Sequence, residues 1–326
     1  MAFDSSHDSS GTASFHEGEV ALQREVGVAE RMGRIGPQVI RDHMPDQHRL
    51  FFPLLPFVIV GSVDARGQPT ASLLSAPPGF VSSPDPKTLR IDALPLAGDP
   101  LEEQLREGAP LGLLGIQPHT ARRNRANGRV LARDASGFSL EVRQSFGNCP
   151  KYIVRREVSH AGAQPRVTLA EGDAAGDAVT PVGRDGFGER ERAIVAGADT
   201  FFLASAHPDA ATSAERAQGV DVSHRGGPPG FAAFIDDDTF VIPDFPGNNF
   251  YNTLGNLRLN PAAGLLFIDV ASGDVLQLEA VTDIVIGTHP LAGPDLRARI
   301  VRFRVRRARR FAAASRLRFG PVHAPD

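Results

Sequence analysis

The chain has 326 residues and a formal net charge of −3 at pH 7, with 41% hydrophobic and 22% charged residues. This composition is typical of a globular protein of about two domains, and it lacks the basic surface expected of a nucleic-acid binder. With no Trp and two Tyr, the chain is also poor in the side chains that stack on single-stranded nucleic acid.

We expect neither a membrane span nor a secretory leader, because no run of 18 apolar residues occurs and residues 1–18 begin polar. The single cysteine, Cys149, excludes an internal disulfide and a multi-cysteine metal site. His207 and His224 lie close in sequence, but no third ligand accompanies them, so no metal site is predicted. The prediction is a cytoplasmic protein whose redox chemistry would need an organic cofactor or a partner.

The first predicted elements are strands. Residues 57–63 are nearly all apolar or β-branched, and residues 64–67 form a turn into a second strand at 68–74. A third strand is expected at 89–94. This part of the chain therefore predicts a β-hairpin followed by a separate strand.

Helix signals come next. Asp99 is a candidate N-cap, Pro100 suits the first helical position, and Gly108 would end the helix. A second helix of the same kind is expected from about Asn249 to Asn260. Because strands outnumber these helices, the fold class predicted is mainly β with flanking helices.

After each helix, an apolar strand leads to a turn and a further strand. The turns are expected at residues 127–128 and 272–273, and the strands that follow them at 139–143 and 275–281. Residues 300–311 alternate apolar side chains with arginines, which predicts an edge strand with one buried face and one solvated face.

The chain also repeats itself. Pro-Pro-Gly-Phe occurs at residues 77–80 and again 151 positions later at 228–231, and Ser72 precedes the first copy as Ser223 precedes the second. A period near 150 residues is the size of a domain, so the repeat predicts two fused copies of one unit, an intrachain pseudo-dimer. Function in such a chain is expected between the halves.

Three segments are predicted. Residues 1–45 form an N-terminal extension with a helix, residues 46–185 the first repeat with a linker, and residues 186–326 the second repeat. The linker is expected within residues 159–188, which are rich in Gly, Ala, Asp and Pro and have no sustained periodicity.

Common catalytic motifs are missing. The sequence has no Gly-x-Ser-x-Gly, no His-Glu-x-x-His, and no Gly-x-Gly-x-x-Gly after a strand, so hydrolase, zinc-protease and Rossmann assignments have no support. Catalytic residues are not assigned from the sequence.

Three strings carry a resemblance to a known family. Residues 144–153 (QSFGNCPKYI), 221–227 (DVSHRGG) and 243–248 (PDFPGN) resemble the predicted flavin-nucleotide-binding proteins related to pyridoxamine 5'-phosphate oxidase. The similarity extends over roughly Phe15 to Val305. The resemblance implies a tandem duplicated FMN-binding split β-barrel, Greek-key and antiparallel, with FMN between two barrels supplied here by one chain.

Arg225 is the candidate phosphate ligand. It precedes two glycines that would let the backbone approach a ligand closely, and Ser223 and His224 supply neighbouring polar groups. The alternative is a surface arginine at a strand end. Leu74 occupies the equivalent place in the first copy, so one complete FMN site per chain is predicted.

The loop before the second helix is a further candidate. Asn248 and Asn249 lie where free backbone N–H groups favour an anion, although a plain Asn N-cap would explain them equally. The resemblance places Asp244 and Gln277 near the isoalloxazine or ribityl part of the cofactor. Either could instead be a hydrogen-bonded polar residue of the barrel.

The string at 144–153 is expected to close the first barrel, and the resemblance turns its start towards the flavin. Gln144, Ser145 and Asn148 offer groups suited to the uracil-like edge of the ring. Lys151 is either a charge that complements the reduced ring or a solvated surface residue. The basic stretch 122–129 is read as a hairpin that could bind an anion or be merely solvated.

The predicted function is an FMN-binding oxidoreductase that passes electrons or hydride through the flavin to a small substrate. The family's appended ferredoxin-like and reductase portion is missing, so a separate reductase or ferredoxin is expected as electron donor. A homodimer is possible. The alternatives are a non-catalytic flavin carrier or sensor, a barrel without cofactor that binds a partner, and a split barrel that binds deazaflavin or haem.

Overall fold

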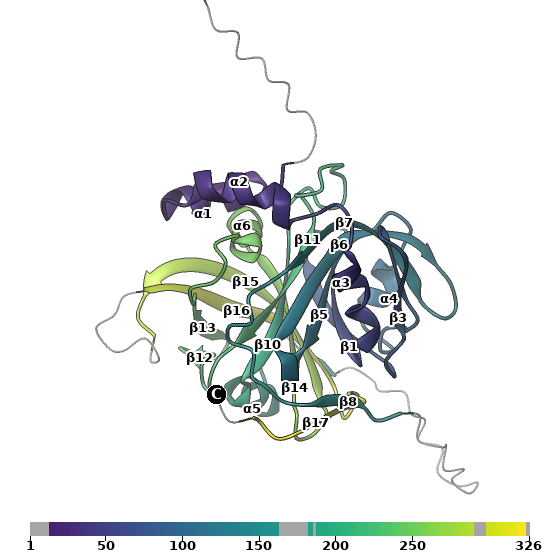
Figure 1. Cartoon of the computed structure of the whole chain (residues 1–326). Coiled ribbons are helices and arrows are strands. Elements are labelled where there is room, and N and C mark those ends of the chain that lie inside the picture. Colours follow the sequence, from purple (N-terminus) through teal and green to yellow (C-terminus); the bar gives the residue numbers. More distant parts are fainter. Residues whose placement is uncertain (1–12, 163–181, 185–186, 290–297, 324–326) are drawn as a thin grey trace, which may run out of the picture.

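A computed structural model describes residues 13–162, 182–184, 187–289 and 298–323. These residues form two large antiparallel sheets and one small two-stranded sheet, with helices at their periphery, which confirms the predicted mainly β fold (Figure 1). Among the described helices none is both long and apolar enough to cross a membrane.

The first half forms a seven-stranded sheet in the order β2-β1-β5-β6-β7-β4-β3. Its hairpin turn arises because the carboxylate of Asp64 accepts hydrogen bonds from the backbone N–H groups of Arg66 at 2.8 Å and Gln68 at 2.9 Å. The strands are β1 (Phe57–Val63), β2 (Pro69–Ser75), β3 (Val81–Asp85), β4 (Thr88–Ile91), β5 (Pro110–Gln117), β6 (Arg122–Arg133) and β7 (Phe138–Gly147).

The second half repeats this arrangement in the order β11-β10-β14-β15-β16-β13-β12, in which each strand number exceeds its counterpart's by nine. The predicted duplication is therefore present in the topology, and each half is a split barrel. The strands are β10 (Thr200–Ala206), β11 (Val220–Gly226), β12 (Ala233–Phe234), β13 (Thr239–Pro243), β14 (Ala262–Ile268), β15 (Val275–Gly287) and β16 (Ala298–Phe311). A short strand, β9 (Val182–Arg184), adds to β16.

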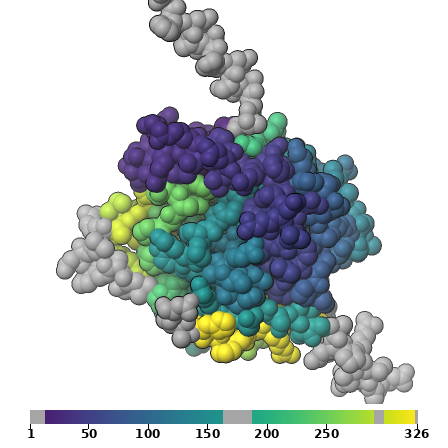
Figure 2. Space-filling view, in the orientation of Figure 1, coloured from purple at the N-terminus to yellow at the C-terminus, as the bar shows by residue number. Residues whose placement is uncertain are grey.

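The N-terminal extension contains two helices where one was predicted. The first begins at His16, whose backbone N–H donates to Glu19 Oε2 at 2.7 Å as in a capping box. Helix α1 packs against α6 of the second half (Figure 1), and apolar residues of the extension also pack with Phe146 of the first half. In Figure 2 the N-terminal segment covers this side of the molecule. The helices are α1 (Glu17–Glu25), α2 (Ala29–Val39), α3 (Asp46–Arg49), α4 (Leu101–Gln104), α5 (Glu189–Gly197) and α6 (Asn252–Leu259), with 3₁₀ turns η1 (Phe52–Leu54) and η2 (Pro118–Thr120).

Strand β1 shows how the barrels are joined. Val58 and Val60 enter the core of the first barrel, whereas Phe57 and Ile59 point to the opposite face and pack in a third apolar cluster shared by both halves. Residues from the second half, including Phe202, complete that cluster. Because both faces of β1 are buried, its first four residues are all apolar and do not alternate with polar ones.

Two glycines bring the halves into close contact. A Cβ atom at Gly112 in β5 would lie 2.6 Å from the carbonyl oxygen of Val220, and one at Gly264 in β14 would lie 2.5 Å from that of Pro69. These four residues occupy equivalent places in the two copies, so the contact is made twice about a pseudo-twofold axis. We call this contact surface between the two halves the seam. It requires a residue without a side chain at both places.

The turn predicted at residues 127–128 is wrong. Asn127 and Gly128 lie inside β6 at a β-bulge, and a Cβ atom at Gly128 would collide with the carbonyl oxygen of Glu141 on β7. The glycine thus permits close strand packing and not a turn. The chain turns after Arg133, where Asp134 Oδ1 accepts from Ser136 N at 2.8 Å.

Three other predictions need correction or lie outside the structure. Strand β16 pairs with both β15 and β13 and is therefore not an edge strand. Helix α4 ends at Gln104, well before Gly108, and its N-cap is Pro100 and not Asp99. The Asp99 carboxylate still accepts from Leu101 N at 2.9 Å. Most of the expected linker, and its boundary near residue 185, lie outside the described residues. The ends of this segment form β8 (Val158–His160), which pairs with β17 (Leu317–Phe319), and β9.

We predict that Gly112→Ala lowers the free energy of unfolding by about 1–3 kcal/mol, because the methyl group would overpack the seam between the halves. Urea unfolding would measure the change. Gly33→Ala is the matched control, since no atom lies within 4 Å of its Cβ position and alanine favours the helix there. Equal unfolding midpoints for Gly112→Ala and the unmodified protein would contradict the prediction.

Candidate functional site

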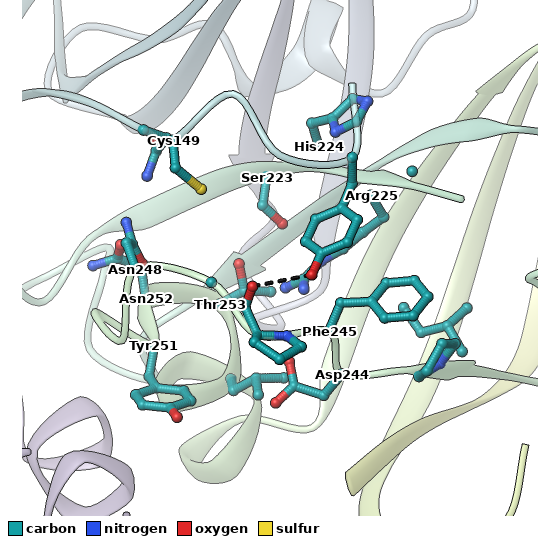
Figure 3. A pocket seen from close by; sticks show the side chains of 18 of the residues that line it. Cys149, Ser223, His224, Arg225, Asp244, Phe245, Asn248, Tyr251, Asn252 and Thr253 are labelled. Atoms are coloured by element: carbon teal, nitrogen blue, oxygen red, sulfur yellow. Dashed lines mark hydrogen bonds between the residues drawn. The ribbon is translucent and has the colours of Figure 1, made fainter. Parts of the chain in front are cut away.

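A cavity of about 460 Å³ lies between the two halves. The first half contributes β6 and the segment after β7, and the second half contributes the ends of β11 and β13 and the start of α6. Figure 3 shows side chains from both halves around this one space. Its polar lining residues include Arg123, Arg125, Asn148, Cys149, Tyr152, Ser223, His224, Arg225, Asp244, Asn248, Asn249, Asn252, Thr253 and Arg299.

Four arginines line the cavity against one carboxylate, Asp244. Arg299 pairs with Asp244 at 3.4 Å, and Arg125 pairs with Asp221, behind the lining, at 3.2 Å. Arg225 has no hydrogen-bond or ion-pair partner among the described residues, although it is only partly exposed. The lining is therefore positively charged, and the guanidinium of Arg225 is available to an anion.

Several buried polar atoms on this surface have no partner within the described structure. They are Nε of Arg123, Nε of Arg225, Oγ of Ser223 and Oδ1 of Asn148. Buried polar groups are normally hydrogen-bonded, and each exception requires an explanation. A ligand with several hydrogen-bonding groups would provide the missing partners.

The arginines of the site repel one another, and burial disfavours their charged forms. Burial, with repulsion from Arg125, lowers the pKa of Arg123 to about 10. Burial also lowers the pKa of Arg225, against the attraction of Asp244. Both arginines remain protonated at neutral pH. A bound anion would relieve this unfavourable concentration of positive charge.

His224 is neutral. Burial, followed by the charges of Arg123 and Arg225, holds its pKa well below the usual range. Nη1 of Arg123 lies 3.1 Å from Nδ1 of His224. Because a guanidinium only donates, Nδ1 accepts and the proton of the imidazole is on Nε2.

The loop between β13 and α6 has an uncommon backbone. Asn249 has φ 64° and Tyr251 has φ 63°, in the left-handed region that residues other than glycine seldom adopt. Asn248 Oδ1 accepts from Phe250 N at 3.1 Å, which stabilises the loop. The loop directs the N-terminus of α6 at the cavity, where Asn252 and Thr253 form part of the lining.

Two aromatic rings connect the halves over the cavity. Tyr152, from the segment after β7, stacks on Phe245 with ring centroids 4.9 Å apart and an interplanar angle of 17°. The Tyr152 hydroxyl donates to the carbonyl oxygen of Pro246 at 3.2 Å. This pair therefore joins the two halves at the lining of the cavity.

Most of the sequence-predicted residues come together here. Asn148, Ser223, His224, Arg225, Asp244, Asn248 and Asn249 all line the cavity. Gln144, Ser145 and Gln277 do not. Ser145 Oγ instead lies 2.8 Å from His48 Nδ1, and Gln144 Oε1 accepts from Asn127 Nδ2 at 3.4 Å, both inside the first half. Lys151 is exposed and also lies outside the lining.

The sequence indicates the basic stretch 122–129, which contains Arg123 and Arg125, as a possible anion-binding segment, but it does not assign these two residues to the cofactor site. The hairpin predicted for this stretch is wrong, because residues 122–129 belong to one continuous strand, β6. Residues two apart on a strand share a face, so the spacing of Arg123 and Arg125 would have placed them together had the strand been recognised. Cys149, a further lining residue, accepts from Nη2 of Arg123 at 3.8 Å.

The pseudo-symmetric position contains a different set of residues. Strand register makes Val275 and Gln277 equivalent to Arg123 and Arg125. The repeat likewise makes Leu73 and Leu74 equivalent to His224 and Arg225. The cationic groups of the cavity therefore have no counterparts at the second position.

Gln277 donates to the carbonyl oxygen of Ala71 at 3.0 Å, as its counterpart Arg125 donates to that of Val222 at 2.7 Å. It also donates to Asp99 Oδ2 at 2.7 Å, and Ser72 donates to Asp99 Oδ1 at 2.7 Å. All three side chains of this network, Ser72, Asp99 and Gln277, are buried. The pseudo-symmetric position is therefore occupied by these three side chains, which hydrogen-bond to one another.

One group of possible metal ligands occurs in the described part of the chain, namely His16, Glu17 and His207. Nδ1 of His16 accepts from Gly18 N at 3.2 Å, and Nδ1 of His207 accepts from Asp209 N at 3.1 Å. The proton of each neutral ring is thus on Nε2, and His207 donates it to Glu17 at 3.1 Å. Ligation of a metal through Nε2 would move the ring proton to Nδ1, which already accepts from a backbone N–H in both histidines, so we assign this group to hydrogen bonding between α1 and the end of β10.

Among known proteins, similarity to this chain is found only in the comparison with solved structures. No family model matches the sequence, and no curated protein matches it. HupZ of Group A Streptococcus is 13% identical with a TM-score of 0.29, and the match covers 42% of this chain and 100% of that one. A FAD-binding protein from Mesorhizobium loti is 11% identical with a TM-score of 0.26, covering 40% and 98%.

A third similar structure is a protein related to general stress protein 26, of the pyridoxinephosphate oxidase family, from Clostridium acetobutylicum. It is 12% identical with a TM-score of 0.28, and the match covers 38% of this chain and 86% of that one. Each of these three matches spans about two fifths of this chain and most of the other chain.

We predict a pH dependence from Asp99. Burial raises its pKa from 3.8 to about 6. The native state therefore binds this proton more tightly than the unfolded state, so the contribution of Asp99 to stability is greatest below pH 4 and is lost as the pH rises through 6. Between pH 4 and pH 7, the stability of the unmodified protein relative to Asp99→Asn should fall by up to about 3 kcal/mol.

Urea unfolding of both proteins across this pH range would measure the difference. Asp237→Asn, at an exposed carboxylate, is the control and should show a constant difference. A constant difference for Asp99→Asn as well would disprove the assignment.

Proposed function

We propose that the cavity between the halves binds FMN and that the protein is a flavoprotein that passes electrons or hydride to a small substrate. The observation that carries the proposal is the unpartnered guanidinium of Arg225, which faces a cavity with a cationic lining and buried polar atoms that lack partners. A volume of about 460 Å³ is within the range of cofactor sites.

Arg225 and the N-terminus of α6 would hold the phosphate. A guanidinium binds a phosphate dianion through two hydrogen bonds, and the free N–H groups and dipole of a helix N-terminus favour the same charge. The buried hydroxyl of Ser223 lies in the same strand as Arg225. These groups provide charge compensation and hydrogen bonds together, which is the requirement of a phosphate monoester.

Asn148 and Arg123, from the first half, would hold the polar part of the ring system. The Asn148 amide offers both donors and an acceptor, and Arg123 offers a positive charge near negative charge that develops on reduction. When bound, FMN supplies the hydride and electron transfer, and the protein supplies orientation and electrostatics.

The electron donor in this proposal is a separate reductase or ferredoxin. The function therefore needs two encounters, one with the donor and one with a small-molecule substrate. A flavin carrier or sensor would use the same cavity without turnover.

The first test is the absorption spectrum of the purified protein, with the released cofactor identified by mass. We expect FMN, bound natively or after addition, at one per chain, because the second position lacks the arginines and is occupied by the network of Ser72, Asp99 and Gln277. A ratio of two would refute the single site. A haem or deazaflavin spectrum, or no uptake of FMN, would refute the cofactor assignment.

Reductant-dependent turnover with an added acceptor would then distinguish an enzyme from a carrier. Stable FMN binding without turnover across a panel of donors and acceptors would favour the carrier or sensor.

Arg225→Ala should weaken FMN binding by about 1.5–3 kcal/mol, which is roughly a 10- to 150-fold rise in Kd, through loss of a charge-assisted phosphate contact. Quenching of FMN fluorescence on binding would give Kd. Arg304→Ala, at an exposed arginine of β16, is the matched control and should leave Kd unchanged. Equal affinities of Arg225→Ala and the unmodified protein would remove Arg225 from the site.

A further inference from the structure

A second cavity of about 440 Å³ adjoins the first at His224, the one side chain that lines both. It lies at the seam between the barrels, where Ile116 is next to the final residue of strand β5 and its equivalent, Ile268, is the final residue of β14. Helix α5 forms a further wall through Ala193 and Ile194. Its apolar lining includes Phe57, Ile116, Ile153, Val154, Ile194, Phe202, Ile268 and Phe319.

The charged groups of this lining are already paired. Arg156 binds Asp199, and Arg190 binds Asp269 at 2.6 Å and Asp274 at 3.2 Å. Both arginines of the second cavity are therefore in ion pairs, whereas Arg225 in the first cavity has no partner among the described residues. A charged ligand would have to compete with these ion pairs, whereas a neutral ligand would leave them intact.

His224 adds one directional group. Its Nδ1 accepts from Arg123, so Nε2 carries the proton, and no described residue accepts a hydrogen bond from that nitrogen. The ring also packs edge-on against Phe202, a residue of the second cavity, with centroids 5.9 Å apart. A ligand that reached His224 would gain from an acceptor atom such as a carbonyl oxygen.

We propose that this second cavity is a binding site for a neutral, largely apolar molecule that carries a carbonyl-type acceptor. An apolar cavity of about 150 Å³ accommodates benzene, so this volume would accommodate roughly two to three rings. The site is distinct from the proposed flavin site and does not require a flavin to be bound. It also places its ligand next to whatever occupies the first cavity, with His224 between them.

The test uses the full-length protein without added flavin and the neutral dye N-phenyl-1-naphthylamine, whose fluorescence rises in apolar surroundings. We expect saturable binding of one dye per chain. Ala193→Trp, on the cavity side of α5, should raise the dye Kd at least tenfold. Ala196→Trp is the matched control, since Ala196 is equally an exposed alanine of α5 but not part of the lining, and its Kd should stay within twofold.

Ala271→Trp, on another part of the lining, provides a second blocking variant, and circular dichroism would confirm that each variant is folded. Absence of saturable binding, or an unchanged Kd in both blocking variants, would overturn the proposal. Displacement of the dye by FMN would also overturn it, since the dye would then occupy the first cavity. A protein that binds the dye but not FMN would refute the proposed flavin function alone.

Competition against the dye would test the role of His224. Menadione, a neutral two-ring diketone, should bind at least fivefold more tightly than 2-methylnaphthalene, which has similar rings without the carbonyl groups. In His224→Phe this preference should disappear while dye binding persists. Equal affinities of the two compounds for the unmodified protein would overturn the acceptor requirement.

Discussion

The packing of the two barrels against each other is the constraint on which the rest of the structure depends. Strands β1, β2, β5, β10 and β14 bury apolar side chains on both faces, one towards the core of their own barrel and one towards the seam. Gly112 and Gly264 allow the backbones to meet there. Burial of the seam positions the ends of β6 and β11 beside each other, and the cationic cavity is formed from these two ends.

Duplication creates two equivalent places at this seam, and the sequence differences between the copies make them chemically unlike. One place has Arg123, Arg125 and Arg225 around an open cavity. The other has Val275, Gln277 and Leu74, with Asp99 accepting from Gln277. Arg125 and Gln277 still donate to equivalent backbone carbonyl groups, so the scaffold is conserved between the halves while the charge is not. A fused chain can specialise one site in this way, whereas a homodimer of identical chains cannot.

Much of the fold was predictable because it depends on local patterns. The apolar run at 57–63, the turn at Asp64 and the alternation of residues 300–311 each identify a strand, since burial on one or both faces sets the spacing of apolar residues. Errors arose where long-range packing decided the outcome. Gly128 follows an asparagine as in a hairpin turn, but the approach of Glu141 on β7 makes it part of a bulge. Strand β16 is an interior strand because β13 pairs with it, and the pattern of residues 298–311 does not predict this pairing.

The sequence by itself determined the strand-rich fold, the duplication and the site residues near Arg225, because neighbouring residues on one strand or loop stay together in any fold. Only the tertiary structure decided that Arg123 and Arg125 join them, that Gln277 belongs to the opposite position, and that a second cavity adjoins His224. These facts depend on contacts between residues about 100 to 200 positions apart in the sequence. Such contacts arise from the packing of whole barrels, and the local pattern of a single chain segment does not specify them.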